Sequence, residues 1–256
     1  MSSKNIICMF YSAVLYRTYI TGDKMNFICK YFICGIALSI SINGFAAEAA
    51  LGTKENIGKA AGAVDVEVLV QSPAAQKTPL QIVCAFEYKE GDLTKSPPAL
   101  PKDLNGLLHV DEALNGLITD LRKSNQFKGQ LLETLLITPP SNTIPAEKLL
   151  IIGLGNRNDF KPEIMKLVGL TGMREALRLG VSSYSHASDL KDAGIDSPTA
   201  EVAGYVISGA SEAFQTQNFL YKQNASSSLT IKKVIVLCGP AYFDDTKTGI
   251  KKVIAP

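Results

Sequence analysis

Short apolar runs alternate with stretches of helical spacing over residues 64–238 of the chain. Residues 64–70 alternate apolar and polar side chains at period two, which predicts a strand with one exposed face. Residues 149–152 are apolar at every position, a pattern that favours a strand buried on both faces of a parallel sheet. Similar short runs, bounded by Gly, Pro or polar clusters, predict further strands at residues 80–88, 134–138, 181–187, 219–221 and 231–238.

Helical spacing of apolar residues predicts three helices, at about residues 107–122, 162–179 and 198–214. The second helix is expected to break near residues 169–172, where two glycines lie, and to end at Gly180. Strands that alternate with helices in this way indicate an α/β fold, with a mostly parallel or mixed sheet covered on both faces. The tail after Gly239 is polar and is not assigned to an element.

The N-terminal part of the chain has the layout of a secretory signal peptide that begins at Met25. Lys30 provides a positive n-region, residues 31–42 form an apolar h-region, and residues 44–49 are mostly small, as a cleavage site requires. The alternative is an uncleaved membrane anchor, since residues 27–47 approach the length that spans a bilayer. Because the h-region is short and ends in small residues, we favour cleavage, which predicts a periplasmic or secreted protein.

These patterns divide the chain into four predicted segments. They are an upstream extension of the reading frame (1–24), a signal peptide (25–47), a polar leader (48–63) and one α/β domain (64–256).

Composition and charge narrow the function classes. The chain is 46% hydrophobic and 20% charged, which is typical of a globular protein. The formal net charge is only +2 and the basic residues are scattered, so the sequence lacks the basic footprint of a nucleic-acid-binding protein. Cys84 and Cys238 fall in strand-like runs, where a disulfide and two buried free thiols are both compatible with the sequence, and we favour free thiols. No Cys or His spacing predicts a metal site.

One glycine-rich turn is a candidate phosphate site. The strand at residues 149–152 leads into Gly153, Gly155, Asn156, Arg157 and Asn158, and glycines at a strand-to-helix turn let backbone N–H groups approach an anion. The turn has neither the third glycine of a dinucleotide fingerprint nor the Lys-Ser/Thr pair of a P-loop. We therefore favour a turn that needs glycine for its backbone, and the five residues stay ligand-binding candidates.

The histidines do not form a recognisable catalytic set. His186 lies among serines and near Asp189, which resembles a nucleophile, base and orienter in composition only, since no G-x-S-x-G elbow surrounds the serines. We interpret His186 as a hydrogen-bonded residue of a strand and His109 as a surface residue of a helix. The sequence therefore predicts no catalytic residue, no metal ligand and no cofactor.

The order of several motifs resembles the N-terminal domain of the leucyl aminopeptidase, or cytosol aminopeptidase, family. The segment FKGQLLET at residues 127–134 is similar to the family's F-x-G-K-x-G-E-T pattern, with Leu132 in place of the second glycine. ETLLI and GLG follow at the family's separation, and the helix that ends near Phe214 precedes an FLYK segment. The resemblance covers roughly residues 64–240 and implies a macro-domain-like, three-layer α/β/α sandwich with a mixed, mostly parallel sheet.

The resemblance also implies a function for the chain. In that family the metal ligands and the catalytic Lys and Arg belong to a C-terminal domain, and no residue up to Pro256 matches them. We therefore expect a non-catalytic, exported, stand-alone copy of the N-terminal domain that acts as a protein-binding or assembly module, with self-association included. The alternatives are an ADP-ribose-like ligand at the glycine turn, or a subunit that needs a separate catalytic chain. A membrane is expected to be contacted only through the signal or anchor segment.

Overall fold

A mixed seven-stranded sheet forms the centre of the computed structural model, which describes residues 48–95, 99–187, 195–226 and 229–254. The strand order is β1-β2-β7-β6-β3-β5-β4. The five inner strands are mutually parallel, and the two edge strands run antiparallel to their neighbours. The strands are β1 (Lys54–Ala60), β2 (Val64–Val70), β3 (Gln81–Ala85), β4 (Thr134–Ile137), β5 (Leu149–Gly153), β6 (Ser183–Ala187) and β7 (Lys233–Cys238).

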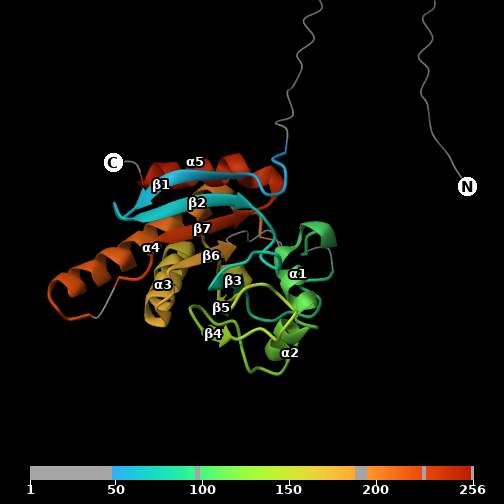
Figure 1. Cartoon of the computed structure of the whole chain (residues 1–256). Coiled ribbons are helices and arrows are strands. Elements are labelled where there is room, and N and C mark those ends of the chain that lie inside the picture. Colours follow the sequence, from blue (N-terminus) through green and yellow to red (C-terminus); the bar gives the residue numbers. More distant parts are fainter. Residues whose placement is uncertain (1–47, 96–98, 188–194, 227–228, 255–256) are drawn as a thin grey trace, which may run out of the picture. The chain divides into compact units, whose positions relative to one another are not determined.

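Helices cover both faces of this sheet, so the fold is a three-layer α/β/α sandwich, as predicted (Figure 1). Helices α3 (Ile164–Leu179), α4 (Thr199–Lys222) and α5 (Phe243–Ile254) pack on one face, and α1 (Gly106–Ala113) and α2 (Leu117–Lys123) pack on the other. The described residues also include the 3₁₀ turns η1 (Lys102–Leu104), η2 (Arg157–Asp159) and η4 (Pro240–Tyr242). None of the described helices is both long enough and apolar enough to cross a bilayer.

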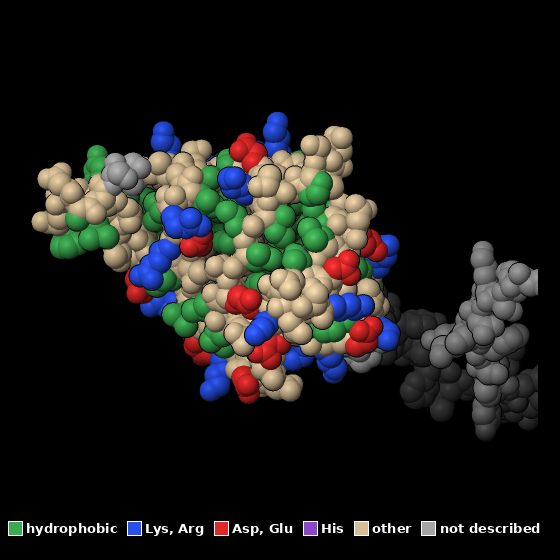
Figure 2. All heavy atoms as spheres, turned by 90° about the horizontal axis from the view of Figure 1, so that it is seen from below, with side chains coloured by type: hydrophobic (Ala, Val, Ile, Leu, Met, Phe, Trp, Pro, Cys, Tyr) green, Lys and Arg blue, Asp and Glu red, His purple; other side chains and the backbone are tan. Residues whose placement is uncertain are grey.

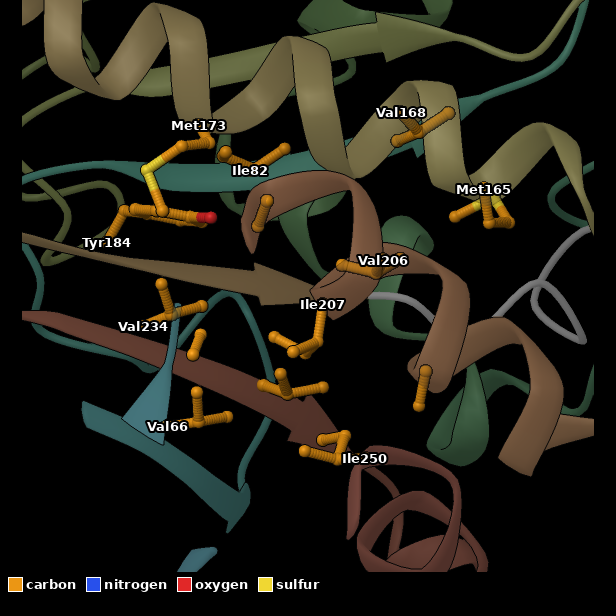
Figure 3. Close-up of a cluster of buried hydrophobic side chains, with 14 of the residues drawn as sticks. Val66, Ile82, Met165, Val168, Met173, Tyr184, Val206, Ile207, Val234 and Ile250 are labelled. Carbon is orange, nitrogen blue, oxygen red and sulfur yellow. The ribbon is translucent and has the colours of Figure 1, made fainter. Parts of the chain in front are cut away.

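The larger hydrophobic core lies between the sheet and α3, α4 and α5. Figure 3 shows side chains from strands and helices pointing into one cluster, among them Ile82, Met173 and Val206. A smaller core, with Val110 and Ile118 at its centre, lies under α1 and α2. Strand β5 contributes alternate residues to both cores and is buried at every position, which confirms the prediction of a strand buried on both faces.

Glycines let the helices of the larger core approach one another closely. A Cβ atom at Gly169 of α3 would lie 2.0 Å from the carbonyl oxygen of Val206, and one at Gly209 of α4 would lie 1.8 Å from that of Lys166. The predicted break near residues 169–172 was therefore wrong, because α3 continues through these positions without interruption. The glycines there serve helix packing rather than helix termination.

Other departures from the prediction have local causes. The predicted strand at residues 219–221 was wrong, since α4 continues to Lys222. The predicted helix at 107–122 is two helices, because Asn115 and Gly116 adopt positive φ values of 57° and 81°. The leader contains β1 and the polar tail contains α5, two elements that the apolar pattern did not reveal.

The predicted upstream extension and signal peptide lie outside the described residues. All described residues belong to one unit, Phe45–Pro256. Cys84 and Cys238 form no disulfide with each other, and β6 separates the strands that carry them.

Candidate functional site

The glycine turn that follows β5 uses its backbone N–H groups within the protein. The amide of Gly153 donates to Glu133 O at 2.8 Å, that of Leu154 to Ala85 O at 2.9 Å, and that of Gly155 to Gly129 O at 2.8 Å. A phosphate cradle needs such donors to point at the ligand. These three are therefore already satisfied by carbonyl oxygens of neighbouring segments.

The turn is also tightly packed against the segment that precedes β4. A Cβ atom at Gly153 would lie 2.0 Å from the carbonyl oxygen of Gln130. Gly129 has a φ of 74°, and a Cβ atom there would lie 2.6 Å from the carbonyl oxygen of Phe86. The glycines thus permit three backbone segments to meet, which supports the interpretation of a turn required by the backbone.

The polar residues of the turn make local contacts. The side chain of Asn156 accepts a hydrogen bond from the amide of Asn158 at 2.9 Å and so caps η2. The guanidinium of Arg157 donates to Asp92 Oδ2 at 3.0 Å and lies 5.4 Å from the centroid of the Phe86 ring. The five predicted residues are adjacent in space. The side chain of Arg157 is therefore held by the carboxylate of Asp92 and is not presented to a ligand.

Asp92 joins two arginines beneath this turn. Arg122 of α2 donates to Asp92 at 2.5 Å and to the carbonyl oxygen of Phe86 at 2.9 Å. The side chains of Arg122 and Asp92 are 1% and 3% exposed, and that of Arg157 is 13% exposed. Desolvation lowers the pKa of Arg157, and the carboxylate of Asp92 opposes this effect. The cluster connects α2, the loop after β3 and the glycine turn. Its members are far apart in the chain, so no local sequence pattern indicated it.

His186 is buried in the sheet and not in a catalytic arrangement. Its Nε2 atom lies 3.9 Å from the Sγ atom of Cys84 on β3, and its Nδ1 atom has no hydrogen-bond partner among the described residues. Burial lowers the pKa of His186 to about 4 and raises that of the Cys84 thiol to about 12. Both side chains are therefore uncharged at neutral pH. The prediction of a hydrogen-bonded histidine on a strand is confirmed for Nε2, whose partner is the Cys84 thiol.

A cavity of about 270 Å³ lies where three parallel strands end. Val70 of β2, Ala187 of β6 and Cys238 of β7 line it from the sheet, and residues of η1, α1 and η4 line its other sides. The carboxyl edge of a parallel sheet is the usual place for ligands in α/β folds. His109, predicted to be a surface residue, is a lining residue of this cavity and lies 3.5 Å from the hydroxyl of Ser72. Sequence reasoning missed this cavity, although the predicted strand ends were the signal that could have located it.

The described residues contain no group of three His, Cys, Asp or Glu side chains that could hold a metal ion. What they offer is a small cavity, a tightly packed glycine turn and a buried arginine cluster on an α/β/α sandwich. Residues 88–217 match the model of the cytosol aminopeptidase family, N-terminal domain. The chain belongs to this family, and the resemblance seen in its motifs is confirmed.

Known proteins similar to the chain agree with this assignment. A probable cytosol aminopeptidase of Thermosynechococcus vestitus is 36% identical over 97 residues, which are 38% of this chain and 18% of that protein. Another, from Geotalea uraniireducens, is 28% identical over 147 residues, which are 57% of this chain and 28% of that protein. The chain thus spans less than a third of the length of either relative.

Solved structures with a backbone similar to that of this chain include a macrodomain and an aminopeptidase. A Trypanosoma brucei macrodomain shares 12% identity at a TM-score of 0.49, with 74% of this chain and 67% of that chain covered. A mutant of tomato leucine aminopeptidase shares 16% identity at a TM-score of 0.49, with 80% of this chain and 38% of that chain covered. The strand order and the layers of this chain define its fold.

Proposed function

We propose that this chain is a non-catalytic, exported binding module of the cytosol aminopeptidase N-terminal type, which holds a partner protein at the end of α4. The family match supports the domain type, because it covers an N-terminal domain and not a catalytic one. The signal-peptide pattern at residues 25–47 supports export. The observation that carries the binding role is the exposed apolar surface at the C-terminal end of α4.

That surface consists of Phe219, Leu220 and Tyr221. The Phe219 side chain is 63% exposed and that of Tyr221 is 47% exposed, on a helix that extends beyond α3 (Figure 1). In Figure 2 hydrophobic side chains gather at the left extremity of the molecule, where α4 ends. Exposed aromatic residues are enriched in protein interfaces and lose solvent contact when a partner binds.

A groove beside this surface indicates the chemistry of the partner. It lies between α3 and α4, measures about 400 Å³, and is lined by Arg174, Arg178, Gln217 and Leu220, among others. Both arginines line the groove, and because Arg178 is already paired with Glu175 at 2.6 Å, Arg174 is the one that offers its guanidinium to a partner. An arginine guanidinium binds carboxylates in a fixed geometry. We therefore infer a partner segment that carries apolar side chains flanked by carboxylates.

Binding of a synthetic acidic peptide provides the test. The probe is a peptide with alternating Leu and Glu residues, titrated into the full chain at low salt, and its affinity is compared with that of a peptide in which Gln replaces Glu. We expect the acidic peptide to bind at least tenfold more tightly. The double variant Phe219→Ser/Tyr221→Ser should abolish binding, and the control Leu167→Ser, at an exposed leucine of α3, should not. Equal affinity for both peptides, or binding by the double variant, would refute the proposal.

The ADP-ribose-like alternative receives less support from the geometry. It placed a phosphate at Gly153–Asn158, where the amides of residues 153–155 are bound to carbonyl oxygens. A thermal shift measurement with ADP-ribose decides it, because ligand at a hundred times its Kd stabilises the folded state by about 2.7 kcal/mol. A shift of that size which disappears at Arg157→Ala would replace the present proposal.

A further inference from the structure

The cavity at the carboxyl ends of β2, β6 and β7 is distinct from the surface at the end of α4. Backbone hydrogen bonds fix its rim, since the amide of Gly52 donates to Val70 O at 2.8 Å and that of Ala49 to Pro240 O at 3.2 Å. Leu51 and Leu104, both lining residues, are 71% and 56% exposed. Large apolar residues exposed at the mouth of a cavity favour a ligand with an apolar group.

The wall of the cavity is apolar apart from a few groups. The apolar lining is provided by Leu51, Val70, Pro73, Leu104, Leu237 and Tyr242, among others. The polar groups include Ser72 and His109, whose Oγ and Nδ1 atoms lie 3.5 Å apart. A mostly apolar wall with a small number of polar groups is typical of sites that bind small molecules and orient them.

The charges of the cavity have one sign. Glu48 and Asp103 are lining residues, and the lining residues that the structure describes include no Lys or Arg. Lys102, which precedes Asp103 in η1, is paired with Glu112 of α1 at 2.7 Å and so has a carboxylate partner of its own. Two carboxylates without a cation attract a positively charged ligand and repel an anion.

We propose that this cavity binds a small primary amine that carries an apolar group, with the ammonium at Asp103 and Glu48 and the apolar group against Val70, Leu104 and Leu237. A volume of about 270 Å³ suits a group the size of one amino acid and is small compared with most ligand sites. The same chemistry is found in a free alkylamine and in the N-terminal residue of a peptide. The site does not depend on the partner surface at the end of α4.

Three ligands with one carbon skeleton test the proposal. Isopentylamine, isopentanol and isovalerate are titrated into the full chain at neutral pH and low salt, and binding is followed by ligand-observed NMR. We expect the amine to bind at least ten times more tightly than the carboxylate, with the alcohol between them. Equal or stronger binding of isovalerate, or no binding of the amine up to its solubility limit, would overturn the proposal.

Variants locate the charge and the cavity. Asp103→Asn should reduce the preference for the amine to less than threefold, and Asp120→Asn, a carboxylate-to-amide change on α2 outside the cavity, should leave it unchanged. Ala241→Trp, at an exposed lining position, should weaken binding of all three ligands. An unchanged preference in Asp103→Asn, with Glu48→Gln equally silent, would refute the assigned charge.

A peptide arm distinguishes the two sources of the amine. Leucyl-glycine with a free N-terminus is compared with its N-acetylated form. Binding of the free dipeptide alone, at least as tight as that of isopentylamine, supports a peptide N-terminus. Binding of isopentylamine alone supports a free alkylamine. Equal binding of the acetylated and free dipeptides would contradict recognition of an ammonium group.

Discussion

The buried imidazole of His186 makes the stability of the fold depend on pH. Desolvation lowers the pKa of His186 from 6.5 to about 4 in the folded state, because the charged form would lie in the apolar core beside the thiol of Cys84. In the unfolded chain the imidazole has its ordinary pKa of about 6.5. Protonation therefore favours unfolding, so the stability is fully present above pH 6.5 and is lost as the pH falls toward 4.

The magnitude follows from linkage between proton binding and folding. A difference of one pKa unit corresponds to about 1.4 kcal/mol, so acidification from pH 7 lowers the free energy of unfolding by about 2 kcal/mol at pH 5 and by about 3 kcal/mol at pH 4. Other groups contribute to the total as well, since carboxylates such as Glu55 and Glu212 have lowered pKa values. A comparison with a variant that lacks the imidazole removes their contribution.

His186→Leu is the suitable comparison. Leucine is apolar and leaves no unpaired nitrogen in the core, so the change at neutral pH is expected to be small. Urea denaturation of both proteins, followed by circular dichroism at pH 7, 6, 5 and 4, gives the difference in free energy of unfolding at each pH. The wild type should lose about 3 kcal/mol relative to His186→Leu between pH 7 and pH 4. A difference that is constant across this range would refute the assignment of a neutral, buried His186.

Three further predictions concern stability and reactivity. Asp92→Ala leaves Arg122 and Arg157 without their shared carboxylate. It should lower the free energy of unfolding, measured by urea denaturation, by about 3–5 kcal/mol. A loss below about 1 kcal/mol would contradict the assigned pairing. Gly153→Ala should lower the free energy of unfolding by about 3 kcal/mol in the same assay, because its Cβ atom would lie 2.0 Å from a carbonyl oxygen. Gly239→Ala, whose Cβ atom would have no contact shorter than 3.4 Å, should leave the free energy of unfolding nearly unchanged. Iodoacetamide should modify neither thiol promptly in the folded protein, because Cys238 is buried with its Sγ donating to Leu69 O at 3.8 Å and burial raises the pKa of Cys84 to about 12; prompt labelling of either thiol without denaturant, detected by peptide mass spectrometry, would contradict this.

The parts of the fold that the sequence predicted are those with large apolar residues at a regular period. Strand β2 alternates at period two, and β5 is apolar throughout, so both were located almost to the residue. Helix α5 was missed because Thr246 and Gly249 occupy half of its buried positions, so few large apolar residues mark its buried face. The apolar triplet at residues 219–221 was misread as a strand because a short run has no detectable period, and the continuing helix determined its conformation.

The site was harder to predict than the fold. The glycine turn was recognised from its local sequence, but its carbonyl partners come from β3 and from the segment before β4, so their effect on the amides could not be predicted. The cavity is formed by segments around residues 48–51, 70–73, 100–109, 187 and 237–242. Only the sheet order places these segments together, and β7 reaches its place between β2 and β6 from near the C-terminus.

The central claim is that the chain binds a partner through the apolar end of α4. Its most direct test is the mass of the species that the tagged full chain forms when it is purified under mild conditions, measured by light scattering after size exclusion. The wild type should elute in a complex, with a defined partner or with a second copy. The variant Phe219→Ser/Tyr221→Ser should elute as a monomer of unchanged stability. A monomer for both proteins, with no copurifying partner, would contradict the account.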